Sequence, residues 1–124
     1  MPTSILNVTF DCRLDSELIA RFWSEVTEWP CEKEEMPGNP YWVVESDEEL
    51  RIRLVFVTVP EMKEMKSRLH LDLLPLGVTQ AAELVRFESL GAHIVDDRRH
   101  LEPGGWVVMK DPEGNEFCLE GGDS

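Results

Sequence analysis

Cysteines are few in this chain, and basic residues are outnumbered by acidic ones. Cys12, Cys31 and Cys118 are odd in number and none belongs to a Cys-x-x-Cys motif, which argues against a disulfide framework or a thiolate zinc site. The 12 lysines and arginines oppose 25 aspartates and glutamates, and the net charge of -13 repels nucleic-acid phosphates and anionic lipids. We therefore expect neither nucleic-acid nor membrane partners.

The sequence also lacks a run of about 18 apolar residues, and it does not open with a basic segment followed by an apolar one. Neither a membrane span nor export is indicated, and the cytoplasm is the expected location. With 124 residues, of which 42% are hydrophobic, the chain is long enough to bury one ordinary core. Since about 60 residues alone would be marginal, we expect a single domain over residues 1–124.

Two short strings occur twice at nearly the same spacing. Arg-Phe begins at residues 21 and 86, and Trp-Val-Val begins at residues 42 and 106, giving offsets of 65 and 64 residues. Two matches at about half the chain length indicate two similar modules in tandem, over about residues 4–60 and 67–121. When two such modules pair their sheets, the faces without helices curl around a shared cavity, where a small-molecule ligand is expected.

The first module begins with a strand and a helix. Residues 5–10 alternate between apolar and polar side chains, which predicts a half-buried strand with Asn7 on its polar face. Asp15 or Ser16 is placed to cap a helix that Pro30 prevents from continuing. The apolar helix positions share one stripe: Leu18, Ile19, Phe22, Trp23 and Val26.

The rest of the first module is predicted to form a loop and two strands. Prolines, a glycine and a charged run indicate a loop over residues 31–40. Strands are expected at residues 41–45 and 51–59, with a polar turn between them. In the second of these strands, alternation places Val57 on the face opposite Phe56.

The second module opens with a strand over residues 68–74 that alternates cleanly. One face carries leucines, and the other carries three ionisable side chains: Arg68, His70 and Asp72. A helix follows, capped by Thr79 and terminated by Gly91. Its apolar positions include Ala82, Leu84, Val85 and Leu90.

Three further strands complete the second module, at residues 93–96, 106–109 and 116–120. A tight turn at residues 111–115, with a proline and a glycine, precedes the last strand. In that strand Phe117 and Leu119 face one way and Cys118 faces the other. Cys118 is therefore expected on the same face as His70.

Several of these segments together resemble a known family. Four segments resemble the second half of a glyoxalase-like domain: the strand at residues 68–73, Leu90-Gly91-Ala92, Gly105-Trp106-Val107-Val108 and Asp111-Pro112-Glu113-Gly114-Asn115. Two segments resemble the first half of such a domain: Phe22-Trp23 followed by Trp29, and Val59-Pro60-Glu61. The parent superfamily is the vicinal oxygen chelate superfamily, which includes glyoxalases, extradiol dioxygenases and bleomycin-resistance proteins. The resemblance implies an α+β fold of tandem βαβββ modules, with a curled mixed sheet around a cavity and helices outside, and a homodimer.

Metal-binding members of this superfamily take ligands from the first and last strands of each module, typically a histidine or glutamine and a glutamate. In the second module His70 matches, and Cys118 stands where a glutamate is expected. In the first module the corresponding positions offer Asn7 or Thr9 and a valine at position 55 or 57. Because a histidine and a cysteine without a third strong donor fall short of a catalytic site, we expect no tightly held metal and no cofactor.

A bound divalent metal remains an alternative, since Glu116 and Glu120 share the face of Cys118. Without a metal, His70 is the candidate catalytic residue and could exchange a proton with a ligand. Asp72 could orient the imidazole and Arg68 could hold an anion. The other candidate ligand contacts are Asn7, Val57, Trp42, Trp106 and Cys118.

The two tryptophans are expected at equivalent places in the two modules, where they either line the cavity or pack in the core. The predicted function is that of a glyoxalase-like small-molecule-binding protein or an enzyme with a cavity site around His70. Authentic glyoxalase activity is disfavoured, because the four ligands are not all present. One alternative is a metal-dependent lyase or dioxygenase of this superfamily, which would make the protein a lyase or an oxidoreductase. The other is a drug-sequestering protein of the bleomycin-binding type.

Overall fold

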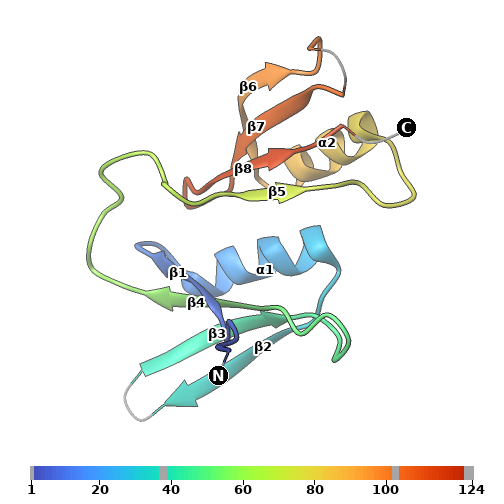
Figure 1. Cartoon of the computed structure of the whole chain (residues 1–124). Coiled ribbons are helices and arrows are strands. Elements are labelled where there is room, and N and C mark those ends of the chain that lie inside the picture. Colours follow the sequence, from blue (N-terminus) through green and yellow to red (C-terminus); the bar gives the residue numbers. More distant parts are fainter. Residues whose placement is uncertain (1, 37–38, 102–103, 122–124) are drawn as a thin grey trace. The chain divides into compact units, whose positions relative to one another are not determined.

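The computed structural model describes residues 2–36, 39–101 and 104–121 of the chain (Figure 1). The chain divides into two compact units, residues 1–62 and 63–124. Each unit is a βαβββ module with one helix and a four-stranded mixed sheet, so the predicted α+β fold of two such modules is confirmed. The predicted cavity shared by the two sheets depends on how the units associate and stays a prediction.

Unit one contains one helix and four strands: β1 (Val8–Cys12), α1 (Ser16–Thr27), β2 (Cys31–Met36), β3 (Asn39–Glu45) and β4 (Arg53–Thr58). The order of strands in its sheet is β1-β4-β3-β2. β1 runs parallel to β4, and the other neighbours are antiparallel.

Unit two repeats this plan with β5 (Leu71–Leu73), α2 (Gln80–Ser89), β6 (His93–Arg98), β7 (Trp106–Lys110) and β8 (Glu116–Leu119). Its strand order is β5-β8-β7-β6, with β5 parallel to β8. None of the described helices is long and apolar enough to cross a membrane.

The core of unit one lies between α1 and one face of its sheet. The side chain of Trp23 is 1% exposed, and its ring contacts those of Phe22 and Phe10, at centroid distances of 5.2 and 5.9 Å. Phe10 stacks in turn on Phe56 of β4 at 4.8 Å. Leu18, expected in this stripe, is 53% exposed, because its position on the helix is turned away from that of its buried neighbour Ile19.

Asp15 proves to be the N-cap of α1, and its side chain accepts a hydrogen bond from the backbone nitrogen of Glu17 at 3.0 Å. The predicted loop over residues 31–40 is wrong, because residues 31–36 form β2. β2 is an edge strand that pairs with β3, Lys33 lying opposite Trp42. Charged residues are common on edge strands, where they discourage pairing with other chains, and here they concealed the strand.

Two opening strands are shorter than predicted. Ile5 and Leu6, expected in the first strand, precede β1 and are 83% and 77% exposed. Residues 68–70 precede β5, and Leu69 is 88% exposed. β5 is short because its partner β8 pairs with it over only Leu71, Asp72 and Leu73.

The core of unit two lies between α2 and its sheet. Phe87 of α2 is 2% exposed and contacts Phe117 of β8 edge to face, with ring centroids 6.0 Å apart. Val107, Met109 and Leu119 are fully buried on the same face. Val85, an expected apolar position of the helix, is instead 69% exposed.

The turn before β8 forms as predicted, around the buried side chain of Asp111. One of its carboxylate oxygens accepts hydrogen bonds from the backbone nitrogens of Glu113 and Asn115, both at 2.9 Å. The other accepts from the side-chain amide of Asn115 at 2.8 Å. Gly114 has a φ of 95°, which other residues rarely adopt. This turn fixes where β8 begins and therefore which of its side chains face which way.

Candidate functional site

The sheet of unit two has one face covered by α2 and one face without a helix, which we call the open face of unit two. Phe117 and Leu119 are buried on the covered face, so Cys118 between them lies on the open face. Strand register places Asp72 of β5 and Val108 of β7 on either side of Cys118. The prediction that His70 and Cys118 share a face is consistent with this arrangement.

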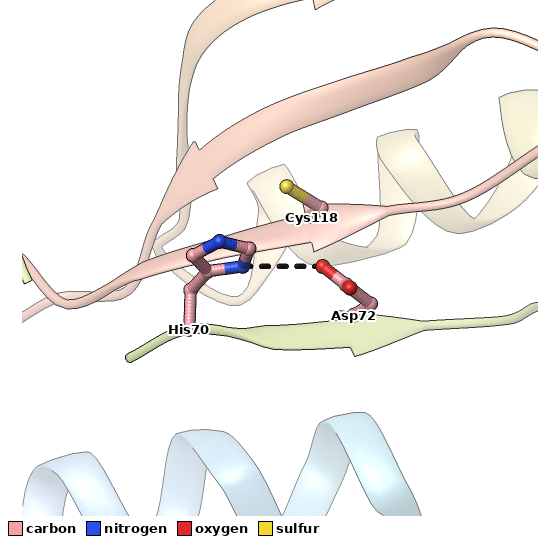
Figure 2. Close-up of side chains that lie close together, drawn as sticks. All are labelled: His70, Asp72 and Cys118. Carbon is pink, nitrogen blue, oxygen red and sulfur yellow. Dashed lines mark hydrogen bonds and ion pairs between the residues drawn. The ribbon is translucent and has the colours of Figure 1, made fainter. Parts of the chain in front are cut away.

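His70, Asp72 and Cys118 form a cluster on the open face (Figure 2). Nδ1 of His70 lies 3.2 Å from Oδ1 of Asp72, within hydrogen-bonding distance. One ligand atom from each of the three residues lies within 4.8 Å of the other two. The side chains of His70 and Asp72 are 43% and 56% exposed, so a ligand can reach the imidazole.

The contact with Asp72 favours one tautomer of the His70 imidazole. An ionised carboxylate only accepts hydrogen bonds, so Asp72 favours the tautomer in which Nδ1 of His70 carries the proton. Nε2 is then left as an acceptor that can take a proton from a ligand or bind a metal. This contact is compatible with the predicted role of Asp72 in orienting the imidazole, and that role stays a prediction.

The thiol of Cys118 is not a nucleophile in this setting. Burial raises its pKa, as do the nearby carboxylates of Asp72 and Glu120, to about 11. At neutral pH the thiol is protonated and unreactive. Burial and Asp72 also raise the pKa of Glu120, so negative charge is concentrated on this part of the open face.

Glu116, the alternative carboxylate ligand in β8, is occupied by other contacts. Its carboxylate accepts from Nζ of Lys63 and from the backbone nitrogen of Ser67, both at 3.0 Å. Burial raises the pKa of Glu116, but the hydrogen bonds from Ser67 and Lys63 outweigh it and lower the pKa to about 2. Glu116 thus anchors the segment that leads to His70 and does not belong to the cluster.

We predict that Glu116→Gln lowers the free energy of unfolding at pH 7 by about 2 kcal/mol, because a neutral amide cannot replace the charge-assisted bonds. The folded pKa is depressed, so the ionic contribution is present above the ordinary pKa of 4.5 and is lost as the pH falls towards about 2. Urea denaturation at pH 7 and pH 3 should show the difference between the two proteins narrowing. A difference that does not change with pH would contradict this account of Glu116.

The remaining predicted contacts lie outside the cluster. Arg68 is exposed and precedes β5. In unit one, Oδ1 of Asn7 accepts from Nε of Arg53 at 2.9 Å, and Val57 is half-buried on β4. Whether Asn7 and Val57 face the same ligand as His70 stays a prediction.

The two tryptophans do not occupy equivalent places. Trp42 pairs with the buried Phe56 on the covered face of its sheet, and the guanidinium of Arg21 from α1 lies 5.2 Å from its ring centroid. Trp106 precedes the buried Val107 and so lies on the open face of unit two, 36% exposed. The two tryptophans are separated by 64 residues, an even number, whereas helix-facing residues at matching places in the two sheets, such as Trp42 and Val107, are separated by an odd number. Because successive residues of a strand face opposite sides of the sheet, the two rings lie on different kinds of face. The repeated string therefore did not reveal which face each ring occupies.

Two features were not predicted from the sequence: Asp72 as a third candidate metal donor beside His70 and Cys118, and a pocket within unit one. Alternation and the family resemblance indicated two metal donors on the open face, whereas Asp72 joins His70 and Cys118. Unit one contains an open pocket of about 780 Å³. Its wall includes Glu32 and Glu34 from β2, the strand that was predicted to be a loop.

The lining of this pocket includes an ion-pair network around Arg53. Its guanidinium lies 3.2 Å from a carboxylate oxygen of Glu34 and 3.4 Å from one of Glu45. Hydrogen bonds from Arg53 and Tyr41 lower the pKa of Glu34. Two carboxylates pair with this one guanidinium, so the network as a whole keeps a negative charge.

Comparisons with known proteins place the fold in a family. Residues 7–120 match the sequence profile of a family described as a glyoxalase-like domain. The hypothetical protein SA1046 from S. aureus is 10% identical, with a TM-score of 0.74 over 98% of this chain and 95% of that one. The fosfomycin resistance protein FosX from Mesorhizobium loti is 17% identical, with a TM-score of 0.73 over 98% of this chain and 94% of that one.

A variant of FosX from Listeria monocytogenes is 13% identical, with a TM-score of 0.70 over 98% of this chain and 92% of that one. Its structure is a complex with Mn(II) and 1S,2S-dihydroxypropylphosphonic acid. No curated protein matches the chain in sequence. At these low identities the structural matches establish the fold and leave the activity open.

Proposed function

Because the chain belongs to the glyoxalase-like domain family, we propose that it binds a small molecule on the open face of unit two, with His70 as the central polar contact. The observation that carries this proposal is the 3.2 Å contact between His70 and Asp72, since it orients an imidazole that a ligand can reach. The FosX variant with its bound phosphonic acid supports the proposal, as it shows this fold holding a small molecule.

Each group on the open face has a distinct part in this proposal. Nε2 of His70 exchanges a proton with the ligand, and Asp72 holds the ring. Trp106 offers an apolar surface for a ring or alkyl group. Asp72 and Glu120 add negative charge, so a neutral or cationic ligand is favoured over an anion. The proposed substrate class is therefore a small oxygenated or aromatic compound without strong negative charge.

The second candidate function is that of a metal-dependent lyase or oxidoreductase of the vicinal oxygen chelate type. The observation that favours it is the approach of Cys118 to His70 and Asp72, within 4.8 Å. Nitrogen, oxygen and sulfur donors from three side chains fit the number of protein ligands in a catalytic metal site. His70, Asp72 and Cys118 would hold the ion, and it would supply Lewis-acid polarisation of a ligand oxygen.

A protein that only sequesters its ligand, as in drug resistance, would use the same face without proton transfer. The proposal also includes two expectations: a cytoplasmic location, which the sequence indicates, and a homodimer, which the family resemblance implies.

A thermal-shift screen in the presence of a chelator separates the two candidate functions. A small molecule supplied at about 100 times its Kd should stabilise the protein by about 2.7 kcal/mol, which raises the Tm by several degrees. We expect oxygenated or aromatic compounds to do so with the chelator present. If every hit requires added metal, the second candidate replaces the first.

A further inference from the structure

We infer that Glu116 and Lys63 are positioning residues for His70: together they hold the segment that leads to it, and so they set where the imidazole stands on the open face. The inference rests on the proposed function, in which His70 contacts the ligand. The effect of Glu116 and Lys63 passes through the position of His70 and requires no contact of their own with the ligand.

Strand pairing in the described sheet of unit two stops short of His70. Pairing between β5 and β8 covers Leu71 to Leu73, and His70 lies one residue before it. Packing holds this part of the chain weakly, since Leu69 is 88% exposed and the side chain of His70 is 43% exposed. Its hydrogen-bond partner Asp72 is exposed as well, and contacts between exposed ionisable groups contribute little. The position of the imidazole therefore depends on how the segment before it is held.

That segment is fastened to β8 by three residues, which we call the clasp: Lys63, Ser67 and Glu116. Oε1 of Glu116 accepts from Nζ of Lys63, and Oε2 accepts from the backbone nitrogen of Ser67, both at 3.0 Å. Nζ of Lys63 also donates to the carbonyl of Met65, so the ammonium joins the segment both to itself and to β8. The clasp fixes the chain at residue 67 and strand pairing fixes it at residue 71, so His70 lies between two fixed points.

Strand register explains why a side-chain carboxylate serves here. Leu71 pairs with Phe117, so Glu116 is the residue of β8 at which pairing with β5 has stopped. Phe117 is buried on the covered face, and alternation therefore turns the side chain of Glu116 to the open face. From there its carboxylate reaches the backbone nitrogen of Ser67. One side chain thus continues the attachment of the segment beyond the last backbone pair.

Glu116 is itself firmly placed. Its side chain is 6% exposed, and its backbone pairs with Lys110 of β7 after the turn around Asp111. Charge-assisted hydrogen bonds to such a shielded carboxylate are stronger than those between neutral groups. A displacement of about 1 Å can cost an active site roughly 100-fold in rate, so release of the clasp should be felt at His70.

Nuclear magnetic resonance of the ligand-free, full-length protein tests the inference. In Glu116→Gln, the amide of Ser67 should exchange with solvent faster, by roughly tenfold or more, because its acceptor loses its charge. The nitrogen resonances of the His70 ring should move towards those of the exposed His93 and His100, because the contact with Asp72 is no longer held in place.

Lysine variants provide a second route to the same result. Lys63→Met removes the donor to Glu116 and should move the His70 resonances in the same direction, which keeps the test decisive if Glu116→Gln does not fold. Lys63→Arg retains a charged donor for the carboxylate and should keep the wild-type resonances.

Two controls separate positioning from stability. Glu64→Gln removes a charge of the same kind from an exposed residue of the same segment and should leave the His70 resonances unchanged. Leu84→Ala truncates a buried residue of α2, should lower the stability at least as much as Glu116→Gln, and should also leave them unchanged. The inference is overturned if a folded Glu116→Gln or Lys63→Met leaves the His70 resonances in place, or if Leu84→Ala moves them as far.

Affinity is measured separately, with the strongest hit of the thermal-shift screen in chelator as the probe. Glu116→Gln should weaken its binding by roughly tenfold, whereas Glu64→Gln should not, and wild-type affinity in Glu116→Gln would also overturn the inference. If no compound of the screen binds, the proposed small-molecule site fails, while the His70 resonances still decide whether the clasp positions the imidazole.

Discussion

Replacing Trp23 by alanine is expected to lower the free energy of unfolding by about 3–5 kcal/mol, the usual range for removing a large aromatic side chain from a core. Trp23 is 1% exposed and its ring contacts those of Phe10 and Phe22. Its loss leaves a cavity between α1 and the sheet that the β-strand backbone cannot close. Urea denaturation followed by far-ultraviolet circular dichroism measures the effect.

Leu18→Ala is the matched control on the same helix. Leu18 is 53% exposed, and alanine is a better helix former than leucine, so the change should stay within about 0.5 kcal/mol. Similar losses from both substitutions would contradict the described packing of α1. They would mean that a different stripe of the helix faces the sheet.

The largest functional effect is expected for His70→Ala. Loss of an oriented imidazole should weaken ligand binding by roughly 10- to 100-fold, as expected for a charge-assisted hydrogen bond. The fold should be retained, because the imidazole is exposed and pairs with the exposed Asp72. Isothermal titration calorimetry with a ligand from the thermal-shift screen measures the affinity.

Two variants delimit the role of His70. Asp72→Asn keeps the side-chain shape but removes the charge that holds Nδ1, so it should reduce the affinity less than His70→Ala does. His93→Ala changes an exposed histidine on β6 and should leave the affinity unchanged. Equal binding by His70→Ala and wild-type protein would remove His70 from the ligand site.

The sequence predicted most of the fold because its strongest signals are local. The caps at Asp15 and Thr79 and the buried stripe of α1 depend on neighbours in the chain. The turn around Asp111 is equally local, because its carboxylate binds residues two and four positions further on. The cap at Thr79 and the turn were predicted correctly, Asp15 was one of two candidate caps, and the stripe was correct except for Leu18, which is exposed.

The features that were missed depend on partners far away in the chain. β2 has a charged sequence and exists because it pairs with β3, which no local pattern records. Pairing between β5 and β8 begins only at Leu71, which likewise shortened a strand whose alternation begins at Arg68. Alternation predicts which residues share a face but leaves undetermined how far a partner strand extends.

The candidate site could be predicted only in part for the same reason. Alternation of apolar and polar residues is sufficient to place His70, Asp72 and Cys118 on one face. That Asp72 stands directly opposite Cys118 follows from strand register, which the sequence does not specify. The position of Trp42 on the covered face required its pairing with Phe56, and that of Trp106 on the open face required the burial of Val107.

The central claim, that a small molecule binds at His70, is tested most directly by nuclear magnetic resonance of the imidazole groups during ligand titration. The chain has three histidines, and His93 and His100 serve as internal controls. We predict that a ligand shifts the ring resonances of His70 in proportion to occupancy and leaves those of His93 and His100 in place. Saturation of the protein with ligand while the His70 resonances stay unmoved would contradict the account.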